Sequence, residues 1–136
     1  MSKLMEASKL VVPFIPKMML VDCIVELAES DTKQIIAAHN GKTLDFGIKV
    51  GDYLNPGGVA ETAIKTGKRQ VLERDSSAFG QPYIAVANPL IENGRMVGVL
   101  TIGYSTAERE QLRKMSENLF GFIEQFSASM QQVSAA

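Results

Sequence analysis

The spacing of apolar residues near the start of the chain predicts a helix followed by a β-hairpin. Residues 2–12 have apolar side chains at helical spacing, and Pro13 and Pro16 should end or kink that helix. Its predicted buried stripe consists of Leu4, Ser8, Val11 and Ile15. Residues 20–27 and 33–39 are rich in Val and Ile, and the Ser30-Asp31 pair between them is typical of a turn.

The middle of the chain predicts a long loop, a short helix and three more strands. Residues 41–54 have weak periodicity and three glycines, so we expect an ordered loop that crosses the sheet. Asn55 should cap a short helix that starts at Pro56 and ends before Gly67. Strands are expected at 68–74, 82–91 and 95–104, with a connection at 75–81 and a turn at Glu92-Asn93-Gly94.

A seven-residue apolar repeat marks the last thirty residues as a long helix. We expect Ser105 to cap its start, with Glu108 completing a capping box. Two series of positions are each spaced by seven: Leu112, Leu119, Phe126 and Val133, and then Met115, Phe122, Ser129 and Ala136. This register predicts a coiled-coil homodimer whose interface includes Leu112, Met115, Leu119, Phe122 and Phe126. The alternative is an amphipathic helix that packs on the sheet of its own domain.

The order of these elements favours the α+β class. We expect a single PAS/GAF-like domain, with an antiparallel sheet of about five strands, an N-terminal helix and a long C-terminal helix. The comparison with PAS and GAF domains is an analogy at the level of the fold, so it does not assign a function.

Composition and charge exclude several classes of protein. A chain of 136 residues with 46% hydrophobic residues can form one domain with a real core. The net charge of −1 provides no basic excess for a phosphate backbone, so nucleic acid is not an expected partner. Prolines, Lys17 and Asp22 interrupt the apolar stretch 10–25, which therefore lacks the ~18 uncharged residues of a membrane span. Cys23 is the only cysteine, which suits a reducing, cytoplasmic location.

The residues with reactive side chains do not form a recognisable catalytic or metal-binding motif. His39 is the only histidine, and a metal site needs several ligands. Cys23 lies in an apolar strand, and a haem or iron–sulfur group would require further ligands. We therefore expect no enzymatic activity, no metal and no cofactor.

Alternation along residues 82–90 predicts a face that suits a small ligand. Tyr83, Ala85 and Ala87 share this face, and the two alanines leave room for a ligand or for a packed terminal helix. The predicted pocket lies between the hairpin 82–104 and the loop 45–53, which would bring Asp45 and Tyr53 to it. Phe46, Ile48 or Leu54 would be the residues that fill the space instead. Arg74 is suited to a small carboxylate, although a surface charge on an edge strand explains it as well.

Five segments resemble a known family of signalling proteins. They are residues 41–45 (GKTLD), 48–52 (IKVGD), 63–69 (AIKTGKR), 79–85 (FGQPYIA) and 126–135 (FSASMQQVSA). Residues 10–136 resemble the N-terminal sensory domain of soluble, cytoplasmic methyl-accepting chemotaxis proteins and the start of their signalling coiled coil. The segment Pro13-Phe-Ile-Pro16 departs from the continuous entry helix of that family.

The resemblance implies a division of labour along the chain. Residues 1–104 would form the sensor domain with its N-terminal helix, and residues 105–136 would begin the dimerising signalling helix. The implied function is to sense a small molecule and to pass the binding signal to a C-terminal coiled coil. The alternative is a ligand-free dimerisation or interaction module of a signalling protein.

Overall fold

The computed structural model describes residues 1–75 and 80–135, with side chains as far as Ser129. Its helices are α1 (Lys3–Val11), the 3-10 helix η1 (Val12–Phe14), α2 (Ile15–Met18), α3 (Val59–Thr66) and α4 (Ala107–Ala135). Its strands are β1 (Cys23–Glu29), β2 (Ile35–His39), β3 (Gln70–Arg74), β4 (Tyr83–Glu92) and β5 (Arg95–Ser105). The chain divides into two compact units, Met1–Ser105 and Thr106–Ala136.

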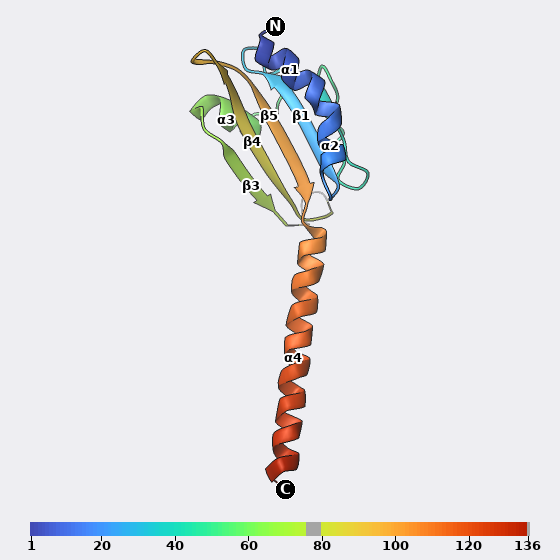
Figure 1. Ribbon diagram of the computed structural model, residues 1–136. Helices are drawn as coiled ribbons and strands as arrows, with labels where there is room; N and C mark the ends of the chain where they lie inside the picture. Colours follow the sequence, from blue (N-terminus) through green and yellow to red (C-terminus); the bar gives the residue numbers. More distant parts are fainter. Residues whose placement is uncertain (76–79, 136) are drawn as a thin grey trace. The chain divides into compact units, whose positions relative to one another are not determined.

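Within the described residues, five strands form one antiparallel sheet in the order β2-β1-β5-β4-β3 (Figure 1). The hairpins β1–β2 and β4–β5 join along β1 and β5, which places β5 at the centre of the sheet. The turn between β4 and β5 is the predicted one, because Asn93 and Gly94 both have positive φ. The predicted α+β architecture is therefore confirmed. Residues 76–79 of the predicted connection lie outside the described part.

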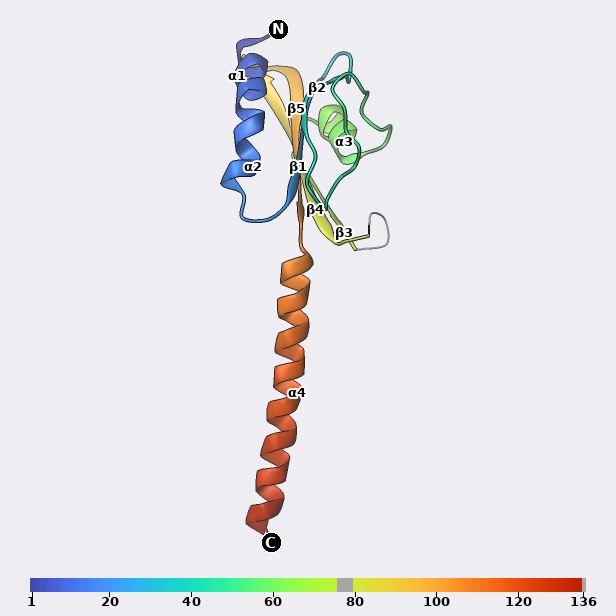
Figure 2. The same ribbon diagram turned by 90° about the vertical axis from the view of Figure 1, so that its right-hand side faces the viewer.

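The two faces of the sheet have different covers (Figure 2). The N-terminal helices α1, η1 and α2 cover one face, which we call the N-helix face. Helix α3 and the loop segment 40–58 cover the other, which we call the α3 face. Because strand side chains alternate, every central strand contributes to both faces.

The N-helix face is closely packed. Its buried residues are Met5, Val12, Cys23, Val25 and Leu27. Helix α1 approaches the sheet at Gly98, where a Cβ atom would lie 2.6 Å from the carbonyl oxygen of Ala28 and would also collide with the Met5 sulfur. The predicted stripe is right at Ile15, which packs against this cluster, but wrong at Val11, which is 51% exposed. Met5 and Val12 are the buried residues of this segment.

Asn55 does not cap helix α3. The chain first makes a turn that is closed by a hydrogen bond from Gly58 N to Asn55 O (3.1 Å), and the helix begins at Val59 with Gly58 as its N-cap. Proline followed by a glycine of positive φ, as in Pro56-Gly57, favours such a turn over a helix start. Gly67 ends the helix in the left-handed conformation, as predicted.

The capping box predicted at Ser105 is also displaced. Ser105 is the last residue of β5, and its hydroxyl donates a hydrogen bond to Gln81 Oε1 (2.8 Å). Helix α4 begins at Ala107, and Thr106 O accepts the bond from Glu110 N (3.0 Å). Pairing in the sheet therefore extends β5 one residue further than the local sequence indicates.

Candidate ligand-binding site

A cavity of about 380 Å³ lies on the α3 face of the sheet. Residues of strands β1 to β5 contribute one wall, and the segment 46–60 contributes the other. Much of the lining is apolar, and it includes Ile24, Ile35, Phe46, Ile48, Leu54 and Val59. The volume lies within the ordinary range of small-molecule sites.

The cavity exists because the sheet is thin beneath it. Ala85 of β4 lies opposite Gly103 of β5 in the strand register, so this pair adds only one methyl group to the α3 face. Phe46 does not fill the space, since its ring packs edge-on against Tyr83 with ring centroids 5.1 Å apart. The result is a partly open cavity between the strands and the loop.

Two polar side chains, Glu26 and Thr101, form part of the cavity lining. They are direct partners in the pairing of β1 with β5, and both face the cavity. Thr101 is 4% exposed, and its Oγ1 atom has no hydrogen-bond partner among the described residues. Burial raises the pKa of the Glu26 carboxyl. A buried hydroxyl without a partner is costly, so this pair requires an explanation beyond folding.

Glu61 fixes the wall that α3 contributes. Its carboxylate accepts hydrogen bonds from Gly57 N (3.1 Å), Lys65 Nζ (3.1 Å) and Lys33 Nζ (3.2 Å). The Gly57 amide, followed by the two ammonium groups, lowers the pKa of Glu61 to about 2. One carboxylate therefore joins the start of α3, the loop before it and the β1–β2 turn.

Asp22 fixes the loop that closes the cavity. Its carboxylate accepts bonds from the backbone N–H groups of Lys42 (2.9 Å), Thr43 (2.8 Å) and Leu44 (2.7 Å), and from the Thr43 hydroxyl (2.8 Å). Burial favours the neutral acid, but the bonds from Leu44, Lys42 and Thr43 outweigh it and lower the pKa of Asp22 to about 2. Gly41 is required here, since a Cβ would lie 2.6 Å from an Asp22 oxygen.

Asn40 holds the far end of the same loop. Its amide donates to Ile48 O (2.7 Å) and accepts from Ile48 N (3.0 Å), as a paired strand residue would. The loop predicted to cross the sheet is thus anchored at both ends, so Phe46 and Ile48 are held against the cavity.

The structure brings three of the six predicted ligand-binding residues to the cavity. Tyr53, Tyr83 and Ala85 line it. Ala87 is fully buried in the core cluster that contains Ala60 and Ala63 of α3. Its small side chain therefore makes room for helix α3, and not for a terminal helix. Phe46, Ile48 and Leu54, the predicted alternative fillers, line the cavity without filling it.

The other two predicted residues lie outside the cavity lining. Asp45 is exposed, and its carboxylate accepts a bond from Gly47 N (2.8 Å) within the loop. Arg74 is exposed at the end of the edge strand β3. Since Arg74 was the reason to expect a carboxylate ligand, the geometry removes the support for that ligand class.

Sequence reasoning missed Glu26 and Thr101. The signal was present for Glu26, because it interrupts the apolar run Ile24-Val-Glu-Leu27 at a position that shares a face with Ile24. Strand alternation alone would have placed its carboxylate on the same side as Ala28. Thr101 acquires meaning only from its pairing with Glu26.

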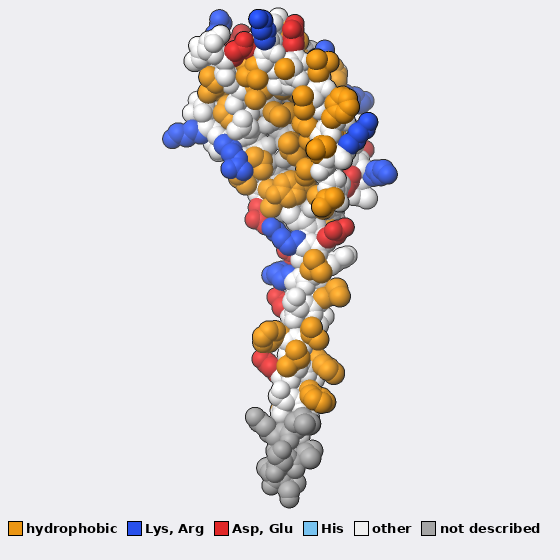
Figure 3. Space-filling view, viewed as in Figure 1, with side chains coloured by type: hydrophobic (Ala, Val, Ile, Leu, Met, Phe, Trp, Pro, Cys, Tyr) orange, Lys and Arg blue, Asp and Glu red, His pale blue; other side chains and the backbone are white. Residues whose placement is uncertain are grey.

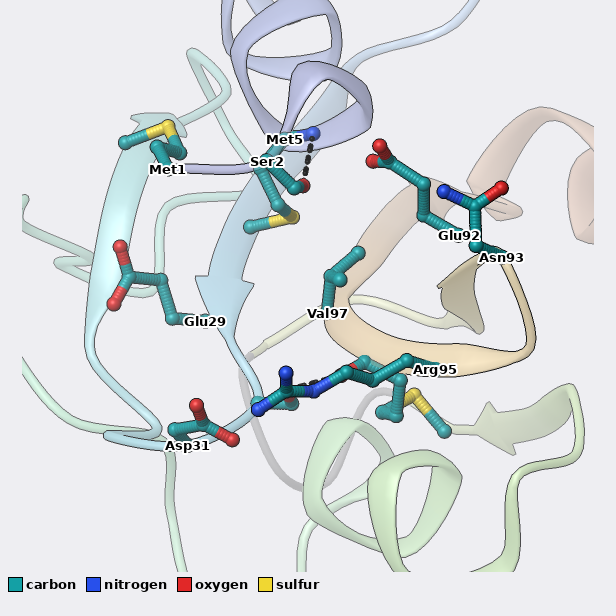
Figure 4. A pocket seen from close by; sticks show the side chains of 11 residues that line it. Met1, Ser2, Met5, Glu29, Asp31, Glu92, Asn93, Arg95 and Val97 are labelled. Atoms are coloured by element: carbon teal, nitrogen blue, oxygen red, sulfur yellow. Dashed lines mark hydrogen bonds between the residues drawn. The ribbon is translucent and has the colours of Figure 1, made fainter.

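A second hollow, of about 510 Å³, lies where the N-terminus of α1 meets the two hairpin turns (Figure 4). Glu92 Oε2 accepts a bond from Leu4 N (2.8 Å). Ser2 Oγ accepts one from Met5 N (3.1 Å), which Figure 4 shows as a dashed line. These bonds satisfy amide groups of the first turn of α1. The acidic side chain of Glu92 therefore has a structural role there.

The described residues contain neither a group of three metal-ligating side chains nor a helix that is long and apolar enough to span a membrane.

Helix α4 has an apolar stripe that its own unit leaves exposed (Figure 3). The predicted seam residues are all more than half exposed: Leu112 (64%), Met115 (66%), Leu119 (59%), Phe122 (63%) and Phe126 (60%). The rings of Phe122 and Phe126 stack with centroids 6.5 Å apart. The seam positions Val133 and Ala136 lie outside the part whose side chains are described.

Comparison with solved structures identifies the fold. The PAS domain of Bordetella pertussis BvgS superposes with a TM-score of 0.54 and 11% identity, covering 88% of this chain and 98% of that one. The fold is that of a PAS domain. A chain of the E. coli DhaR(N)–DhaL complex gives a TM-score of 0.56 and 14% identity, covering 95% of this chain and 53% of that one.

Comparison of sequences finds one similar protein that is named as a sensory transducer. The chain is 33% identical over 90 residues to the Bacillus subtilis (strain 168) protein named "Putative sensory transducer protein YfmS". The matched region is 65% of this chain and 32% of that relative, so the chain spans about a third of the relative's length. No family model matches the chain.

Proposed function

We propose that this chain is the ligand-sensing domain of a cytoplasmic methyl-accepting chemotaxis transducer, without enzymatic activity. The observation that carries the proposal is the cavity of about 380 Å³ with its apolar lining and the unpartnered hydroxyl of Thr101. A packed structural core would be filled and its polar atoms satisfied. The similarity to a sensory transducer supports the same function.

The path of the signal follows from the connectivity of the chain. Thr101 is part of the cavity lining, and its strand β5 ends at Ser105, immediately before the first residue of the second unit. A ligand that moves the backbone at Thr101 therefore acts on the strand that continues into α4. In this proposal α4 is the start of the coiled coil that receives the signal.

The occupant proposed for the exposed stripe of α4 is a second copy of the same helix. Its residues repeat at positions a and d of a heptad, which is the pattern of a helix that pairs with another helix. Burying one large apolar side chain contributes about 1.5–3 kcal/mol. Five such side chains on each of two helices give a homodimer enough apolar contact.

A ligand screen by thermal shift tests the sensing function. A compound that binds only the folded state raises Tm, and filling the cavity should abolish that rise. We expect hits on the parent protein that are lost in Ala85→Leu, which places three more carbon atoms in the cavity. Val71→Leu is the control, because Val71 is 60% exposed. Hits that raise the Tm of Ala85→Leu as strongly as that of the parent would refute the assignment.

Analytical ultracentrifugation over micromolar concentrations tests the homodimer. We expect Phe122→Ala to weaken association and Phe120→Ala to leave it unchanged. Both residues are phenylalanines of similar exposure, 63% and 69%, but Phe120 follows Leu119 and points about 100° away from the seam around the helix. Equal effects of the two variants would exclude this seam.

The exposed stripe of α4 also favours a second candidate, a dimerisation module that needs no ligand. That candidate predicts the same dimer, and it predicts that Ala85→Leu raises stability without any loss of function. Signalling by a full-length transducer with Ala85→Leu separates the two, since a ligand sensor should lose its response.

A further inference from the structure

We infer that the cavity takes a small organic amine, whose ammonium group is bound by Glu26 and Thr101 and whose apolar body fills the rest of the space. This inference rests on the proposed sensing function and names the ligand class of the same site. It replaces the small carboxylate that the sequence suggested through Arg74.

The ionisable side chains at the cavity favour a cationic ligand over an anionic one. Glu26 and Asp52 both line it, and none of its described lining residues is a lysine, arginine or histidine. The nearby ammonium groups of Lys33 and Lys65 are paired with Glu61 at 3.2 and 3.1 Å. A carboxylate ligand would therefore be placed beside Glu26 without a counter-charge, which is strongly unfavourable in a partly buried site.

The unpartnered hydroxyl of Thr101 favours a ligand that donates a hydrogen bond. Thr101 is 4% exposed and its Oγ1 has no partner among the described residues, so a ligand that donates a hydrogen bond removes a folding penalty. An ammonium group has three N–H donors and no acceptor. Glu26 and Thr101 are opposite each other in the ladder, where Cβ atoms are about 4.5–5.5 Å apart, so one nitrogen can reach both.

The state of Glu26 agrees with a cationic ligand. Burial raises the pKa of its carboxyl, because the charged form has lost water and no ion-pair partner within the described residues replaces it. The other ionisable side chains of the lining are Asp52, Tyr53 and Tyr83, and none of them is a cation. An ammonium group would supply the missing counter-charge.

The rest of the cavity sets the body of the ligand. Apolar side chains such as Phe46, Ile48, Leu54 and Leu72 make up much of the remaining wall, and its other polar side chains are Asp52, Tyr53, Asn55 and Tyr83. The four apolar side chains offer no hydrogen bonds, so the part of the ligand that contacts them is a short aliphatic or aromatic group.

Matched compounds test the ligand class by calorimetry and thermal shift. The probes are 2-phenylethylamine, 2-phenylethanol and phenylacetate, together with the amine, alcohol and acid of a five-carbon branched chain. We expect each amine to bind at least about tenfold more tightly than its alcohol, the ratio that an added charge-assisted hydrogen bond provides. We expect no binding of the acids.

Three variants connect the effect to the two side chains. Glu26→Gln keeps the size of the side chain but removes its charge, so the preference for amine over alcohol should disappear. Thr101→Val should weaken the binding of amine and alcohol alike. Glu6→Gln, an exposed acid on α1, is the control and should bind as the parent does.

The outcomes separate this inference from the proposed function. Binding of an alcohol or acid as tight as that of the amine, or an unchanged amine affinity in Glu26→Gln, overturns the amine and keeps the cavity as a ligand site. If none of the six probes binds, the amine is refuted, whereas ligand sensing at this cavity is decided by the thermal-shift screen with Ala85→Leu.

Discussion

The two faces of the sheet use the same strands in opposite ways. On the N-helix face Leu27 and Val25 are fully buried beneath Met5 and Val12, and Gly98 allows the helix to approach closely. On the α3 face the residues of the same strands border the cavity and include Glu26 and Thr101. One side of the sheet is therefore closely packed, whereas the other side holds the cavity in which we propose that the ligand binds.

The hollow face is held by polar contacts at its edge. Asp22, Asn40 and Glu61 each anchor a loop or helix end through hydrogen bonds to backbone groups. Such bonds fix geometry without filling space, whereas the N-helix face depends on close packing of apolar side chains. We therefore expect substitutions on the two faces to differ in cost.

Removing a large side chain should be most costly on the packed face. We expect Leu27→Ala to lower the free energy of unfolding by about 3 kcal/mol, because Leu27 is fully buried and its neighbours cannot refill the space. Leu72→Ala, which enlarges a cavity that already exists, should cost about 1 kcal/mol. Urea denaturation measures both, and equal losses would show that the α3 face is packed as tightly.

Adding a methyl group should also lower the free energy of unfolding more on the N-helix face than on the α3 face. Gly98→Ala should cost about 2–3 kcal/mol, since its Cβ would lie 2.6 Å from the Ala28 carbonyl oxygen, which cannot move without the strand. Gly103→Ala should cost less than about 1 kcal/mol. There the nearest atom is Ile24 Cγ1 at 2.8 Å, and that side chain borders the cavity and can turn into it. The reverse order in thermal melts would contradict this account.

Neutralising either of two glutamates on the α3 face should change Tm in opposite directions. Both changes should be smaller than those of the packing substitutions. The pKa of Glu61 is lowered to about 2, so its contribution to stability is present above pH 4.5 and is lost as the pH falls towards 2. The pKa of Glu26 is raised, so the charged form of its carboxyl lowers the stability of the folded state at neutral pH. At pH 7 Glu61→Gln should lower Tm and Glu26→Gln should raise it slightly. At pH 2.5 the effect of Glu61→Gln should have largely disappeared.

Much of the fold could be predicted because it depends on local patterns. Alternation placed Tyr83, Ala85 and Ala87 on one face, and the Asn93-Gly94 turn set the second hairpin. The start of α3 was missed because the Pro56-Gly57 turn competes with a cap at Asn55.

The candidate site was harder to predict because it depends on contacts between distant parts of the chain. Whether Asp45 or Tyr53 reaches the cavity depends on how Asp22 and Asn40 hold the loop. The pairing of Glu26 with Thr101 joins two strands from opposite hairpins. Neither the anchoring of the loop nor the pairing of Glu26 with Thr101 can be predicted from the spacing of residues that are close in the sequence.

The single thiol of the chain has a practical consequence. Cys23 is 2% exposed on the N-helix face, and burial, together with the neighbouring Asp22 charge, raises the pKa of its thiol. It is therefore protected from alkylating reagents while the N-terminal helices stay in place. The sequence has no other cysteine. The fraction of molecules that gain mass in a timed pulse of iodoacetamide therefore measures how often the N-terminal helices have moved away from the sheet. The native chain thus contains its own reporter of how often the packed side of the domain comes apart.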